Sequence, residues 1–328
     1  MDALLLNIPQ DERVPRLVPI ARCRSLDMLD VCWCYQYTRF TIAQLRTLHA
    51  ALNLPPVFHL AHRYRCSSEE GLIVTLAKLA TGFTNVKLCD VFGERDDRCI
   101  SAIYGHTIGA LDERSNGVCH GNCLERWVED FPLFSAAIAR KLSLPEYGGH
   151  QFNDFRVFGF IDGKIDATTI PGTGPVIDEP QAPRQPDAAV LQEAVYSGYL
   201  KKHGLKVLTL VLPNGIVAYV YGPISAREND IGALNLSGLN GHLIALQPNI
   251  EHEQALGLES LYYSVYTDSI FPFLECVTHR HEPPVRGALL EREVVENHAM
   301  SAMQNLVEWP YGGVTILFHI MQSKYYCK

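Results

Sequence analysis

The sequence predicts an α/β fold, in which a mixed sheet flanked by helices follows a mainly helical amino-terminal domain. Apolar residues recur at helical spacing through roughly the first 150 residues, and from Phe155 onward β-rich runs alternate with helical stretches. The chain has 328 residues, of which 47% are hydrophobic and 20% charged, so it can bury the core of two domains. We place the boundary near residues 145–155 and expect domains over residues 1–150 and 151–328.

Charge and cysteine content limit the classes of protein that the chain can represent. With 36 acidic and 28 basic residues the formal net charge is −8, which argues against gripping nucleic acid over the whole surface but allows a local basic groove. No apolar run approaches the ~20 residues of a membrane span. The amino terminus lacks the basic start of a signal peptide, so we expect the ten cysteines to be reduced in an intracellular protein.

The first half of the sequence contains a series of short helices. Residues 41–52 carry an apolar face, and SSEE at 67–70 caps a helix that ends at Gly82. Further helices are expected at residues 85–92 and 96–111.

Residues 84–111 could form a helix-turn-helix with residues 96–111 as the recognition helix. Its first turn, residues 94–98, holds three acids and two bases, and DNA phosphates would repel those acids. Plain helical packing is the alternative interpretation, and both remain open at this point.

The second half reads as a sheet interleaved with helices. Pro213-Asn214-Gly215 is a hairpin turn signature between two of its β-rich runs. The expected elements are strands within residues 155–164, 206–224 and 261–271 and helices at 226–239 and 299–306, with a proline-rich irregular loop at 170–188.

Four carboxylates stand where such a sheet would gather them. Asp162 closes the first β-rich run and Asp268 closes the fourth, while Asp230 lies in the helix after the third. Glu308 belongs to the last helix. Each acid alone is more simply a cap, turn or surface residue, but together they could converge at one sheet edge. Converging carboxylates repel each other unless cations hold them, which suits Mg²⁺ or Mn²⁺ with a phosphate completing the shell.

The same residues fall within segments that follow a known pattern. These are IDGK at 161–164, YSGYLKKHGLK at 196–206, LPNG at 212–215 with Gly222, Pro223, Arg227 and Asp230 after it, YTDSIFP at 266–272, and VEWPYG at 307–312. The set resembles the nuclease domain of PIF/Harbinger-type transposases, which are DDE superfamily endonucleases, and the resemblance extends over roughly residues 65–315.

The resemblance implies an RNase H-like fold and a metal-dependent DNA endonuclease or transposase. Asp162, Asp268 and Glu308 would form the catalytic acidic triad, and Asp230 would be an additional contact for Mg²⁺ or Mn²⁺. Two such ions would support hydrolysis and transfer of phosphodiester bonds.

A basic cluster and the family resemblance suggest how DNA is bound and which partner proteins take part. Lys201, Lys202, His203 and Lys206 form the strongest basic cluster after Asp162, so they could contact phosphates; a solvated turn is the alternative. The resemblance further implies transposon-end DNA as substrate and a separate Myb/SANT-like DNA-binding partner that helps nuclear entry, so we expect a nuclear location, with a cytoplasmic one as the alternative when the partner is lacking. A homo-oligomer is a further hypothesis.

Three positions depart from the family pattern; the first two departures are tolerable, whereas the third, with the apolar stretch YGGVTILFHI after it, favours an alternative function. Lys164 follows the first acid where the family has Thr, Thr267 replaces a Gly before the second acid, and Pro310 is expected to stop or kink the helix that carries Glu308. The alternative is a domesticated or decayed transposase that serves as a non-catalytic binding or scaffold protein. An RNase H-like hydrolase unrelated to transposition is a weaker third hypothesis.

A zinc site is a minor further hypothesis. Cys119 and Cys123 have C-x₃-C spacing, and His279 and His281 could complete a site, but the pairs are far apart in the sequence and ordinary loop thiols are favoured.

Overall fold

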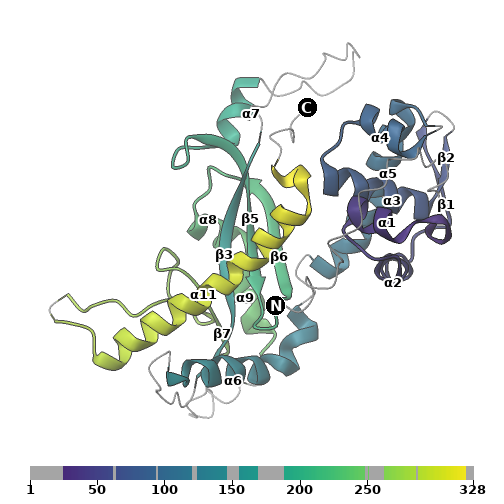
Figure 1. The fold of residues 1–328 in the computed structure, drawn as a ribbon. Coiled ribbons are helices and arrows are strands. Elements are labelled where there is room, and N and C mark those ends of the chain that lie inside the picture. The colour runs from purple at the N-terminus through teal and green to yellow at the C-terminus, as the bar shows by residue number, and fades with distance from the viewer. Residues whose placement is uncertain are drawn as a thin grey trace. The chain divides into compact units, whose positions relative to one another are not determined.

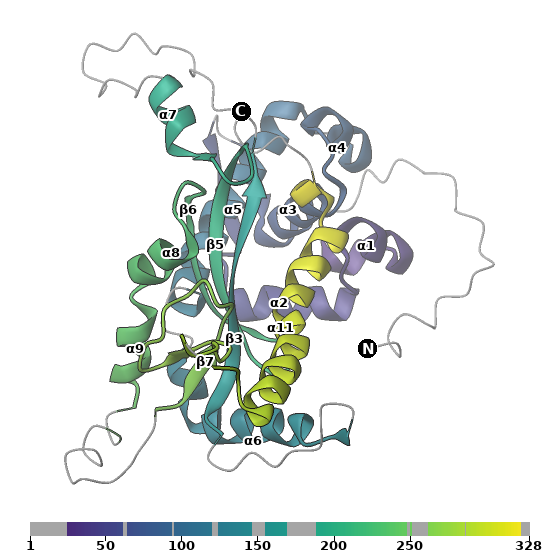
Figure 2. The same ribbon diagram turned by 90° about the vertical axis from the view of Figure 1, so that its left-hand side faces the viewer.

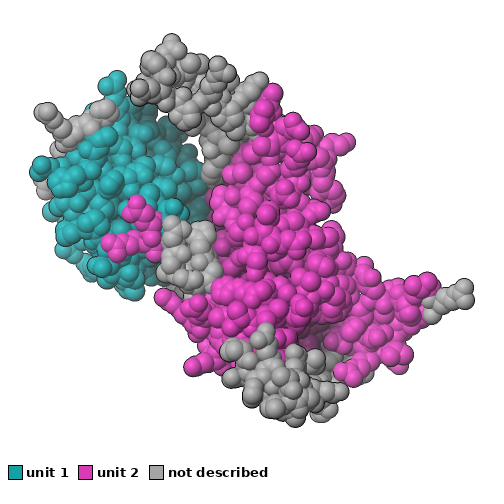
Figure 3. All heavy atoms as spheres, turned by 180° about the vertical axis from the view of Figure 1, so that it is seen from behind, with its two compact units in different colours: residues 1–112, 318–320 teal, residues 113–317, 321–328 magenta. Residues whose placement is uncertain are grey.

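The computed structural model divides the chain into two compact units, coloured separately in Figure 3. It describes residues 25–61, 64–93, 95–119, 124–145, 155–168, 188–247, 250, 262–285 and 287–322. Unit 1 comprises residues 1–112 with 318–320, and unit 2 comprises residues 113–317 with 321–328. The division falls earlier than the boundary expected near residue 150, because helix α6 (Phe131–Leu142) packs on the sheet of unit 2. Phe131 of α6 stacks on Phe158 of that sheet, with ring centroids 3.8 Å apart.

Unit 1 is mainly helical. Its elements are η1 (Leu26–Met28), α1 (Val31–Thr38), α2 (Ile42–Leu52), the paired strands β1 (Val57–His59) and β2 (Arg65–Ser67), α3 (Ser68–Thr81), α4 (Asn85–Phe92) and α5 (Asp97–Cys119), which continues into unit 2. Thr41 caps α2 in a complete capping box, and Ser67 caps α3. Helix α3 is buried along most of its length and forms the centre of the unit 1 core.

Helices α4 and α5 are the pair expected to form a helix-turn-helix, and the residues before α5 are engaged in packing. The Arg95 guanidinium donates hydrogen bonds of 3.0 and 2.9 Å to the buried carboxylate of Glu70. Asp96 accepts hydrogen bonds from the Tyr64 hydroxyl and from the backbone N–H of Cys99. These contacts favour the packing interpretation for Arg95 and Asp96.

Unit 2 is built on a mixed sheet of six strands (Figure 1). The strands are β3 (Val157–Ala167), β4 (Tyr196–Ser197), β5 (Lys202–Val211), β6 (Val217–Ser225), β7 (Ser264–Tyr266) and β8 (Val277–Thr278). Strand β5 pairs antiparallel with β3, β4 and β6, whereas β7 runs parallel to both β3 and β8. The predicted hairpin is confirmed, with Gly215 at φ 80° in the turn between β5 and β6.

Helices cover both faces of this sheet, as Figure 2 shows. Helices α8 (Asp230–Ser237) and α9 (Leu239–Ala245) pack against one face, on a core that includes Ile161 and Leu208. Helix α11 (Glu291–Leu317) packs against the other face, on Phe160. The remaining elements are η3 (Leu124–Asp130), α7 (Ala188–Ala194) and η5 (His319–Gln322). This α/β arrangement is compatible with an RNase H-like fold.

Two details differ from the sequence expectations. Helix α11 continues through Pro310 to Leu317, so the proline does not stop it. Asp162 lies in the middle of β3 rather than at its end, because β5 pairs with β3 from Phe160 to Ala167. In the described part of the chain no helix is long and apolar enough to cross a membrane.

Candidate active site

The first two candidate acids follow a pair of residues that face each other on two parallel strands. Phe160 of β3 is paired with Tyr266 of β7, and both side chains lie in the core beneath α11. Asp162 follows Phe160 by two residues within β3, and Asp268 follows Tyr266 by two residues, just beyond the end of β7. β7 ends at Tyr266. Among the described residues, therefore, no strand pairs with this edge of β3 beyond Phe160.

Helix α11 brings the third acid to this place. The Tyr311 hydroxyl donates a hydrogen bond of 3.2 Å to the backbone carbonyl of Asp162 and is also hydrogen-bonded to Thr209. Glu308 precedes Tyr311 by three residues, so the two lie on neighbouring turns of one helix face. Glu308 is exposed, and its charge acts on Asp162.

The pKa of Asp162 responds to the charges of the other three acids. Burial, with smaller contributions from the negative charges of Asp230, Glu308 and Asp268, raises the pKa of Asp162 to about 6 against the opposing effect of a hydrogen bond from the Gly163 N–H. The charges of the other three carboxylates therefore all reach Asp162. Among the described residues, however, no group of three or more His, Cys, Asp and Glu side chains is close enough to form a preassembled metal cage.

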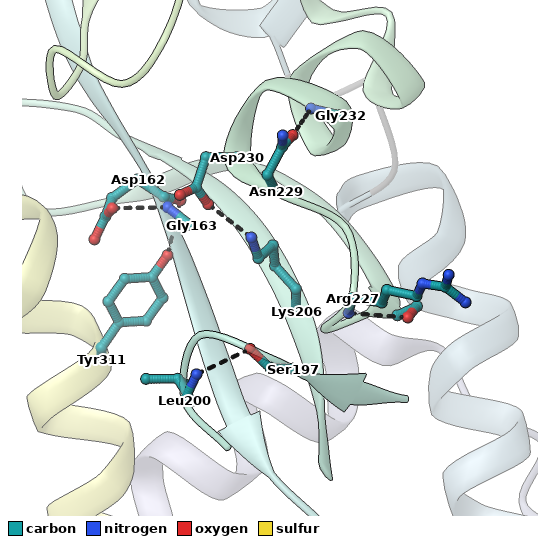
Figure 4. Close-up of polar contacts among 11 residues, drawn as sticks. Asp162, Gly163, Ser197, Leu200, Lys206, Arg227, Asn229, Asp230, Gly232 and Tyr311 are labelled. Atoms are coloured by element: carbon teal, nitrogen blue, oxygen red, sulfur yellow. Dashed lines mark hydrogen bonds and ion pairs between the residues drawn. The ribbon is translucent and has the colours of Figure 1, made fainter. Parts of the chain in front are cut away.

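Asp230 approaches β3 from the opposite face. A Cβ added to Gly163 would overlap the Asp230 carboxylate, and successive residues of a strand point to opposite faces. Figure 4 shows Asp162 and Asp230 on either side of Gly163. The Asp230 carboxylate instead forms a 3.0 Å ion pair with Lys206, whose side chain is only 4% exposed. Asp230 thus adds negative charge to the site from behind the strand.

The predicted basic cluster has an exposed part and a buried part. Lys201 and Lys202 are exposed at the start of β5, and His203 is half-buried against the Tyr196 ring. Lys206 is buried and neutralises Asp230. Only the outer part of the cluster is therefore exposed to solvent.

The Lys164 ammonium, which could compete with a metal cation for the candidate acids, is paired with another residue. Its ammonium forms a 2.9 Å ion pair with Asp166 and lies 3.4 Å from the Thr315 hydroxyl, above the Tyr311 ring. The lysine therefore helps to fasten α11 to β3. Thr267, the other departure, is fully buried, and its hydroxyl donates to the backbone of Thr278 in β8.

Sequence reasoning missed two residues that organise the site. Tyr311 could have been found from its spacing, because it follows Glu308 by one helical turn. Gly163 was visible only as part of the IDGK motif, since the close approach of Asp230 depends on the fold.

The zinc hypothesis stays untested, and so does the proline-rich loop. Residues 120–123 and 169–187 lie outside the described residues. His281 forms a 3.2 Å pair with Glu296, and the His279 ring bonds to the Arg280 carbonyl.

An α/β unit whose helix-flanked mixed sheet gathers carboxylates is a framework suited to a hydrolytic nuclease. Residues 176–327 match the family model of the DDE superfamily endonuclease. This match includes Asp230, Asp268 and Glu308 and begins after Asp162. No curated protein and no solved structure matches the chain. The matched segment supports a transposase-derived nuclease in general terms, with DNA as its substrate class.

Proposed function

We propose that this protein is a DNA endonuclease of the PIF/Harbinger transposase type that depends on Mg²⁺ or Mn²⁺. The single observation that carries the proposal is the parallel pairing of Phe160 in β3 with Tyr266 in β7, because Asp162 and Asp268 follow these paired residues by two positions each. The match to DDE superfamily endonucleases supports the same assignment.

The donor chemistry fits a divalent metal. Asp162, Asp268 and Glu308 offer only carboxylate oxygens, the ligands that Mg²⁺ and Mn²⁺ prefer. Burial and, to a smaller extent, the neighbouring acids disfavour the charged form of Asp162, and a bound cation would offset both effects. Bound ions would activate the attacking oxygen and stabilise the leaving oxygen of the phosphodiester.

The residues of the chain have separate tasks in this proposal. Tyr311 holds α11, and with it Glu308, against the Asp162 strand. Lys201 and Lys202 contact the DNA backbone. Because the described acids form no preassembled cage, a substrate phosphate completes the coordination.

Calorimetric titration with Mn²⁺, with and without a DNA duplex, tests the metal site. Wild type should bind Mn²⁺ saturably when DNA is present, and Asp162→Asn and Asp268→Asn should each abolish this binding. Glu275→Gln, which changes an exposed acid bonded to Asn240 elsewhere in unit 2, should have no effect. Plasmid cleavage should fall in the same two variants by more than about 100-fold, as expected when transition-state charge stabilisation is lost.

A non-catalytic scaffold is the second candidate, favoured by the absence of a preassembled cage among the described residues. It predicts no Mn²⁺-dependent cleavage and no metal binding with DNA present. A metal-dependent nuclease that cleaves DNA without transferring strand ends would indicate the RNase H-like hydrolase hypothesis instead.

The proposal extends to partners and location. The net charge of −8 supports a division of labour in which a Myb/SANT-like protein supplies most of the grip on transposon ends. We propose a nuclear location for that complex, with the chain acting as a homo-oligomer. Co-purification with the partner and light scattering of the purified chain test these points.

A further inference from the structure

An open pocket lies on the face of β3 opposite to Asp162, entirely within unit 2. Its volume is about 520 Å³, within the range of small-ligand sites. It is lined by Gly163 and Ile165 of β3, by Lys206 of β5, by residues 197–200 and 226–230, and by Ile270.

One wall of this pocket is apolar and aromatic. The turn between β4 and β5 carries Tyr199 and Leu200, and the Tyr199 side chain is 92% exposed. Ile270 contributes a further side chain that is 56% exposed. An aromatic ring held in solvent beside a hollow can stack on a flat ligand, which would remove apolar surface from water.

The lining carries no net positive charge. Lys206 is paired with Asp230 at 3.0 Å, and Arg227 is paired with Glu193 at 3.3 Å, while Glu228 adds a further acid. A phosphate would find no net positive charge inside. A neutral, planar molecule with polar edges suits the pocket better.

Positive charge is found instead next to the aromatic turn. Lys201 and Lys202 follow Tyr199 and Leu200 directly and are exposed. Stacking aromatics beside backbone-binding lysines are the usual means of holding single-stranded nucleic acid. Gly163 and Ile270 also connect the pocket to the acids, since they follow Asp162 and Asp268 by one and two residues.

We propose that this pocket holds one unstacked nucleobase of a DNA strand, with the base stacked on Tyr199 and its backbone held by Lys201 and Lys202. This inference rests on the proposed action on DNA and adds to it that the strand is locally unpaired when bound.

Binding without metal tests the pocket separately from cleavage. Fluorescence anisotropy would measure the affinity of the full chain for a short labelled oligothymidylate in the presence of EDTA. Tyr199→Ala should weaken binding about tenfold, in the range of one lost base–aromatic stack, and Tyr199→Trp should preserve it. Phe273→Ala removes an exposed aromatic of the same unit that does not line the pocket and should leave affinity unchanged.

Photocrosslinking identifies the contact directly. An oligothymidylate with one iododeoxyuridine should crosslink to Tyr199, as located by mass spectrometry of the peptides. A crosslink mapped elsewhere, equal affinity of Tyr199→Ala and wild type, or no binding of the oligonucleotide would each overturn the pocket assignment.

These outcomes are independent of the proposed nuclease. Cleavage that persists undiminished in Tyr199→Ala, together with unchanged oligonucleotide affinity, would refute the pocket and leave the nuclease standing. Tyr199-dependent binding without any Mn²⁺-dependent cleavage would support the pocket and refute the nuclease.

Discussion

Asp162 is the residue on which the chemistry of the site depends, and its burial has a measurable consequence. Its pKa rises from 3.8 to about 6 in the folded chain, chiefly through burial. Between about pH 4 and 6 the folded state therefore holds a proton that the unfolded state has lost, so stability falls as pH rises across this window. Above about pH 6 the buried charge remains a constant penalty.

Asp162→Asn should consequently stabilise the metal-free protein by about 1–3 kcal/mol near pH 8 and by little below about pH 4. Urea unfolding in EDTA at both pH values measures this difference. Asp166→Asn, which removes the ion-pair partner of Lys164 on the same strand, is the control and should not show such a gain. An equal gain at both pH values would mean that burial of the Asp162 charge is not its cause.

Gly163 is the second residue whose identity the fold requires. The Asp230 carboxylate occupies the space that a side chain at this position would need, and it is fixed there by Lys206. Gly163→Ala should lower the free energy of unfolding by about 1–3 kcal/mol, the usual cost of overpacking. Gly241→Ala, a helical position with open space around it, should not destabilise the protein. Chemical denaturation of the two variants provides the comparison.

Helix α11 is the element whose position decides whether the acids meet. It carries Glu308, and beyond Pro310 it is fastened to β3 through Tyr311 and through the Lys164–Thr315 contact. These contacts explain why α11 continues past a residue that has no N–H to donate. Intrinsic helix preference would end it there, and tertiary packing overrides that preference.

Pro310→Ala should therefore strengthen α11 and raise the free energy of unfolding by about 1–3 kcal/mol. Thermal unfolding followed by circular dichroism would detect the higher Tm. Pro284→Ala, in the segment between β8 and α11, serves as the control and should not raise it. A lower Tm in Pro310→Ala would show instead that the helix is built around the proline.

The strand elements show what sequence patterns can and cannot predict. The apolar run before Asp162 predicted β3. The run ends close to Phe160, the last residue of β3 that is paired with β7, whereas β3 itself continues to Ala167. The length of a neighbouring strand is a tertiary property, so Asp162 was expected at the end of the strand. Likewise, the pattern of lysines could not show that Lys206 is buried, because its partner Asp230 is 24 residues away in the sequence.

At the scale of the whole molecule, the acidic balance limits how the chain can hold DNA. The formal net charge is −8, and within the predicted basic cluster only Lys201, Lys202 and the half-buried His203 face outward. Each phosphate neutralised by a protein cation contributes about −0.9 to the slope of log affinity against log salt concentration. Two or three contacts thus give a shallow slope of about −2 to −3 for duplex DNA.

Anisotropy titrations of a labelled duplex against the full chain over a range of NaCl concentrations measure this slope. The double variant Lys201→Gln with Lys202→Gln should lower its magnitude by about 2, because two counterion-releasing contacts are lost. Lys87→Gln changes an exposed lysine in unit 1, so the same assay distinguishes the contribution of unit 1 to DNA binding from that of unit 2. If Lys87→Gln reduced the slope and the double variant did not, the helices of unit 1 would be the DNA-binding surface, and the helix-turn-helix hypothesis would return. A slope that follows Lys201 and Lys202 alone would mean that tight, site-specific binding must come from a partner protein.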